Sequence, residues 1–195
     1  MIYLFAGLLI FLGVHSTRIF ADDWRTSVIA SRGPNAWKGL YSVLSLAGFV
    51  LLCWGFGQAR QHPVVLWTPP VFTRHLAALL TLFAFVLVAA SHLPGNLIKA
   101  KLHHPMVLGV KVWALAHLLA NGTLAHLLLF GGFLVWAVLS FRAARQRDRA
   151  QGTVYPAGRL GPTLAAVGGG VVAWAVFAFW AHGALIGVKP FGGAV

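Results

Sequence analysis

Six apolar stretches separated by short polar breaks constrain the fold of this chain more than any other feature. They cover residues 2–20, 37–56, 71–93, 106–120, 124–141 and 163–188. A helix needs about 20 apolar residues to cross the hydrocarbon of a bilayer, and most of these stretches come close to that length. The sequence therefore predicts an all-α integral membrane bundle of about six transmembrane helices. Five is the alternative, because stretch 106–120 is short.

The composition supports this reading. Hydrophobic residues make up 59% of the chain and charged residues only 9%, whereas soluble domains are about a quarter charged. A chain this apolar cannot cover its own surface with polar groups, so the lipid bilayer must cover it. No long polar segment remains between the stretches. We therefore expect residues 1–195 to form a single transmembrane domain.

The net charge of +12 is divided among short loops. With the N-terminus outside, eleven basic residues fall in the inner loops and three in the outer segments. The inner ones are Arg18, Arg25, Arg32, Lys38, Lys99, Lys101, Arg142, Arg145, Arg147, Arg149 and Arg159; the outer ones are Arg60, Arg74 and Lys189. This bias predicts that both termini are outside. Because the charge never forms one patch, we expect no nucleic-acid binding.

Histidine dominates the ionisable chemistry of the apolar stretches. The chain has nine histidines and three acidic residues, and the acids Asp22, Asp23 and Asp148 all lie near the inner ends of helices. A carboxylate pair inside the bundle is therefore unavailable, which disfavours glycosidase and two-metal mechanisms. Cys53 is the only cysteine, so disulfides and thiolate-metal sites are excluded. Imidazole ligation remains, to haem iron, zinc or copper.

His15 and His117 are the strongest candidates, because both lie inside apolar runs, where an unused imidazole is costly. His104 and His117 are thirteen residues apart, about 20 Å along a helix, so they cannot share one metal. The spans place His15 and His117 about 6 Å to opposite sides of mid-membrane, a gap that helix tilt could partly absorb. His92 and His104 are the alternates. The competing interpretation is an imidazole that only hydrogen-bonds a neighbouring carbonyl.

Several local features carry further expectations. Residues 31–35, SRGPN, are expected to form a loop, and Arg18 and Asp22 have the spacing of a helical ion pair. The stretch FRAARQRDRAQG at 141–152 is expected to be an exposed helical extension without a binding role. The glycines at 131–132 and 168–170 are expected to let helices pack closely.

Longer strings extend these single-residue observations. They are HSTRIFADDWR at 15–25, WKGLYS at 37–42, HHP at 103–105, WALAHLLANG at 113–122 and TVYP at 153–156. Together they resemble the NnrU family of bacterial membrane proteins over nearly the whole chain. That family has a genetic link to nitrite and nitric oxide reduction. It is similar to the plant 15-cis-ζ-carotene isomerase, a membrane enzyme that uses histidine-ligated haem b.

The resemblance implies a haem b held by His117 and His15 and a location in the bacterial inner membrane. Many relatives have Arg-His-Pro where this chain has His103-His104-Pro105. The resemblance leaves three functions open. The first is isomerisation of a cis double bond in an apolar polyene. The second is a non-enzymatic haem or metal protein that supports denitrification, and the third is a structural membrane subunit. Whether the protein is an enzyme stays open.

Overall fold

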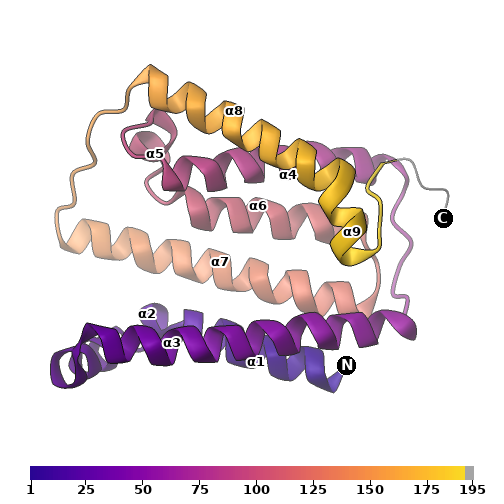
Figure 1. The fold of residues 1–195 in the computed structure, drawn as a ribbon, viewed down its shortest axis with the longest axis horizontal. Helices are drawn as coiled ribbons and strands as arrows, with labels where there is room; N and C mark the ends of the chain where they lie inside the picture. Colours follow the sequence, from indigo (N-terminus) through magenta and orange to yellow (C-terminus); the bar gives the residue numbers. More distant parts are fainter. Residues whose placement is uncertain (192–195) are drawn as a thin grey trace. The chain divides into compact units, whose positions relative to one another are not determined.

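The computed structural model describes residues 1–191, which form helices joined by short connections (Figure 1). The described residues contain no strand, only two isolated β-bridges. The all-α prediction is therefore confirmed. The helices divide into two compact units, one made of residues 1–68 and 121–145 and the other of residues 69–120 and 146–195. Each unit is described by itself.

Four helical segments are long and apolar enough to cross a membrane. They are α3 (Asp22–Gln61), α4 (Phe72–His92), α7 (Leu124–Ala150) and the continuous stretch Leu160–Ile186. The remaining two apolar helices are shorter: α1 (Ile2–His15) has 14 residues and α6 (Pro105–Ala120) has 16. All six predicted stretches are thus helical, and the chain is a helical membrane protein.

In the first unit, α1 packs along α3 so closely that their backbones nearly touch (Figure 1). A Cβ added at Gly48 would lie 2.7 Å from the backbone nitrogen of Phe11, and one at Gly55 would strike the backbone of Leu4. Small residues permit such approach in membranes, where packing replaces the hydrophobic effect as the driving force between helices. The glycines that bring α1 against α3 lie outside the two runs singled out from the sequence.

The first apolar stretch is shorter as a helix than expected. The α1 helix ends at His15, and the four-residue helix α2 (Thr17–Phe20) follows after Ser16. The Thr17 hydroxyl donates to the carbonyl of Val14 at 2.9 Å, which holds this break. The expected loop at residues 31–35 is instead a kink inside α3, because Gly33 adopts φ 83° and ψ 158° while the residues on both sides stay helical.

In the second unit, α4 packs against both α6 and α8 (Leu160–Val176). A Cβ at Gly170 would lie 2.6 Å from Cα of Val86, whereas Gly168 and Gly169 have open space. The close-packing expectation therefore holds for one glycine of that run. Beyond α8 the helix widens into a π-turn, η1 (Phe177–Ala181), and ends with α9 (His182–Ile186), where Gly187 takes a left-handed conformation.

The connection between α4 and α6 contains a helix that the sequence analysis treated as loop, α5 (Leu97–Leu102). Asn96 caps it: its side-chain oxygen accepts from the backbone N–H of Lys99 at 2.7 Å, and its amide donates to the carbonyl of Ala90 at 2.8 Å. The Asn96 side chain is fully buried. Its hydrogen bonds replace those that the chain loses where α4 ends.

Candidate functional site: two intramembrane histidines and a polar cluster

His15 is the last residue of α1, and its imidazole is held by its own helix. The Nδ1–H donates to the carbonyl of Phe11 at 2.7 Å, and the ring stacks on the Phe11 ring with centroids 4.2 Å apart. A carbonyl can only accept, so Nδ1 carries the proton and Nε2 carries the lone pair. Nε2 is therefore the atom available to a ligand.

Two aromatic side chains from other helices border the His15 ring. Tyr41 of α3 lies with its centroid 5.2 Å from that of His15, and Trp136 of α7 stands edge-on at 6.1 Å and 83°. The indole nitrogen of Trp136 is buried and has no hydrogen-bond partner in residues 1–191. A buried N–H without an acceptor costs about 1–3 kcal/mol. It is the kind of donor that a bound polar group would satisfy.

His117 lies in α6 and repeats the arrangement of His15. Its Nδ1–H donates to the carbonyl of Trp113 at 2.8 Å, and the two rings lie 5.2 Å apart. In both cases an aromatic residue four positions earlier supplies the carbonyl and packs on the ring. Both imidazoles therefore bond a carbonyl of their own helix through Nδ1, as the competing interpretation expected.

The other sequence candidates have different surroundings. His15 belongs to the first unit, while His117, His92 and His104 belong to the second. His92 ends α4 and is exposed. Joint ligation of one iron by His15 and His117 therefore stays a prediction.

His104 takes part in a polar cluster at the start of α6. Its Nε2–H donates to Asp148 Oδ2 at 2.8 Å, and the hydroxyl of Tyr155 donates to the same oxygen at 3.0 Å. The side chains of His104 and Asp148 are only 22% and 14% exposed. The helical extension of α7 to Ala150 is confirmed, but the expectation that it is exposed is wrong at Asp148. Sequence reasoning missed the contact because the partners are 44 residues apart.

The residue before His104 has a strained backbone. His103 adopts φ 68° and ψ −52°, and the N–H of His104 donates to the carbonyl of Leu102 at 2.8 Å. This is a γ-turn of the rare type with positive φ. The ring of His103 stacks on that of Tyr155 at 4.0 Å and 13°. The HHP step and the TVYP segment are therefore in contact.

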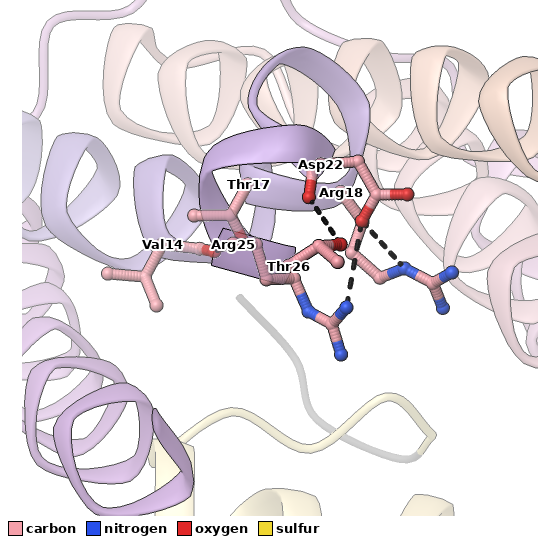
Figure 2. Close-up of polar contacts among 6 residues, drawn as sticks. All are labelled: Val14, Thr17, Arg18, Asp22, Arg25 and Thr26. Carbon is pink, nitrogen blue, oxygen red and sulfur yellow. Dashed lines mark hydrogen bonds and ion pairs between the residues drawn. The ribbon is translucent and has the colours of Figure 1, made fainter. Parts of the chain in front are cut away.

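Beyond His15, charged side chains gather at the start of α3 (Figure 2). Arg18 Nε lies 3.5 Å from Asp22 Oδ1, as the sequence spacing predicted, and Arg25 Nη1 lies 3.7 Å from the same oxygen. The Arg25 guanidinium also lies 5.8 Å over the ring of Trp37. Exposed pairs of this kind contribute little to stability, but they concentrate positive charge next to the end of α1.

His126 near the start of α7 is a further half-buried imidazole that sequence reasoning did not single out. Its Nδ1 shares a hydrogen bond with Thr123 Oγ1 at 2.6 Å, and its ring stacks on Phe130 and meets Phe56 edge-on. The available signal was its place in the apolar run LAHLLLF. The Thr123 bond and the aromatic packing account for its burial.

The family model described as NnrU protein matches residues 3–190. The chain belongs to the NnrU family. No curated protein and no solved structure matches it.

The number of side chains that could bind a metal together in this NnrU family member helps to distinguish a zinc site from a haem site. No group of three or more His, Cys, Asp or Glu side chains that could hold a metal ion occurs in residues 1–191. A bare zinc ion requires three or four protein ligands. Haem iron requires only one or two, because the macrocycle supplies the rest. Single imidazoles with a fixed Nδ1–H, such as His15 and His117, therefore fit haem better than zinc.

Proposed function

We propose that this NnrU family protein binds haem b through the Nε2 atoms of His15 and His117. The observation that carries the proposal is the shared arrangement of these two imidazoles. Each lies in an apolar helix, donates Nδ1–H to the carbonyl four residues earlier and packs on the aromatic ring of that residue. A hydrogen bond at one ring nitrogen fixes the tautomer and raises the basicity of the other nitrogen, as in most metal-binding histidines.

The activity that we propose is isomerisation of a cis double bond in an apolar polyene. When bound by His15 and His117, haem b would supply an iron that can exchange one imidazole for a double bond of the polyene. The chain itself would contribute the imidazoles, oriented by Phe11 and Trp113, and apolar helices that exclude water. The carboxylate of Asp148 is engaged with His104 and Tyr155, so this proposal gives it no role in the reaction.

The test is an absorbance spectrum of the detergent-purified protein, oxidised and reduced, after expression with ample haem. We expect a Soret band that is lost or strongly shifted in His15→Ala and in His117→Ala. His104→Ala serves as the control and should leave the spectrum mostly intact, because its Nε2 is bonded to Asp148. A colourless wild-type protein would overturn the haem assignment.

The alternative is a non-enzymatic haem protein that supports nitrite and nitric oxide reduction by sensing, assembly or electron transfer. The same two imidazoles support this alternative, because a protein can bind haem through them without contacting any substrate. Conversion of a cis-polyene by the haem-loaded protein in liposomes separates the two functions. Turnover that depends on His117 supports the isomerase, and a red protein without turnover supports the alternative.

We further propose that the protein lies in the bacterial inner membrane with both termini in the periplasm. The support is the concentration of basic residues in α2 and the first half of α3, in α5, and from the last turns of α7 to Arg159, a distribution that follows the positive-inside bias.

A further inference from the structure

The buried indole N–H of Trp136 differs from that of Trp174. Trp174 Nε1 donates to Thr81 Oγ1 at 3.1 Å, whereas Trp136 Nε1 is buried without an acceptor in the described part of the chain. Hydrocarbon contains no water that could satisfy it. An acceptor is therefore expected to arrive with a bound group.

The position of Trp136 indicates which group that is. Its ring stands edge-on to the His15 imidazole, which Tyr41 of α3 also borders. The Trp136 side chain as a whole is only partly buried, so a rotation about its side-chain torsions can present the N–H to a group seated on His15 Nε2. The donor and the proposed iron ligand would then serve the same occupant.

The charges near this position favour an anionic occupant. Two exposed basic residues lie close in sequence to the side chains at this position. Arg18 comes three residues after His15, and Lys38 comes three residues before Tyr41. Positive charge near a binding position attracts carboxylates, and haem b carries two.

We propose that Trp136 Nε1–H donates a hydrogen bond to a carboxylate oxygen of the haem bound at His15. Trp136 would then be a positioning residue that holds this carboxylate beside His15. This inference rests on the proposed haem binding at His15. It adds a hydrogen-bond donor, Trp136 Nε1–H, to the contacts that His15 makes with the haem.

The test compares haemin with haemin dimethyl ester, in which both carboxylates are neutral. Each is titrated into haem-free protein in detergent, followed by the Soret band. Hydrogen bonds to a charged group contribute enough for about a tenfold change in affinity. We expect wild-type protein to prefer haemin by about that factor. Trp136→Phe should lose most of this preference while binding the ester as wild-type protein does.

Thermal unfolding of the haem-free protein gives a second, independent readout. Trp136→Phe removes a donor that has no acceptor, so it should not lower the unfolding temperature. The matched control is Trp174→Phe, which removes a satisfied donor and leaves Thr81 without its partner. It should lower the unfolding temperature and leave the preference for haemin unchanged.

The outcomes separate this inference from the function on which it rests. If His15→Ala abolishes haemin binding but Trp136→Phe keeps the wild-type preference, haem binding stands and the role of Trp136 fails. The role also fails if Trp136→Phe weakens haemin and ester equally, or destabilises the haem-free protein as Trp174→Phe does. If wild-type protein binds neither compound, both proposals fall.

Discussion

Asp148 and His104 form a largely buried hydrogen-bonded pair, with Nε2 of the imidazole 2.8 Å from the carboxylate oxygen. The pair joins the end of α7 to the start of α6 within the second unit. Tyr155 donates to the same carboxylate from the connection to α8. Three separate segments therefore meet at one oxygen atom.

Replacing Asp148 with Asn should destabilise the protein by about 1–3 kcal/mol, because buried donors lose a charged acceptor. The measurement is thermal or denaturant unfolding in detergent. Asp23→Asn is the control, since Asp23 is exposed and should change stability little. Equal stability of both variants would show that the cluster contributes nothing to the fold.

Substituting alanine for Gly48 should push α1 away from α3, because the added Cβ would lie 2.7 Å from the Phe11 backbone nitrogen. Overpacking of this kind costs about 1–3 kcal/mol. Gly57→Ala on the same helix is the matched control: a Cβ there meets nothing within 4 Å, and alanine favours helix. We expect a lower unfolding temperature for the first variant alone.

Cysteine labelling tests the proposed topology. In a Cys53→Ser background, a cysteine at Gln146 should react with a membrane-impermeant thiol reagent only after the cytoplasmic side is opened. Gln146 is exposed, so access to the side chain does not limit the reaction. Labelling from the periplasm of intact cells would reverse the orientation.

Neutralising Arg142, Arg145, Arg147 and Arg149 to Gln should weaken the orientation bias, because basic residues near span ends hold loops on the cytoplasmic side. The expected result is a mixed labelling pattern at position 146. Haem binding should persist in correctly inserted molecules, since the proposed ligands lie elsewhere. Unchanged insertion in every assay would contradict the prediction.

Hydropathy and spacing predicted the parts of the structure that depend on local sequence. The apolar runs and the Arg18–Asp22 pair follow from composition and helical period, and the structure has both. The loop expected at residues 31–35 is only a kink at Gly33. The sequence did not predict α5 because the helix has only six residues. It depends on the buried side chain of Asn96, which caps it.

The environment of the candidate site could not be read in the same way. His15 and His117 stand out as imidazoles in apolar runs, but Tyr41 and Trp136 reach His15 from helices distant in sequence. The partnership of Asp148 with His104 is equally non-local. The basic run at 141–152 is typical of a solvated helix, and nothing in its sequence indicates that Asp148 is largely buried.

The local bond between each candidate histidine and the carbonyl four residues earlier has a consequence for biogenesis. Because α1 and α6 satisfy the imidazole N–H themselves, neither helix must wait for another segment to neutralise that donor during insertion. The nascent chain can therefore enter the bilayer and fold before any prosthetic group is present. Under the proposed haem binding, loading of the cofactor would be a late step of maturation, and a haem-starved cell would accumulate an inserted, loadable precursor.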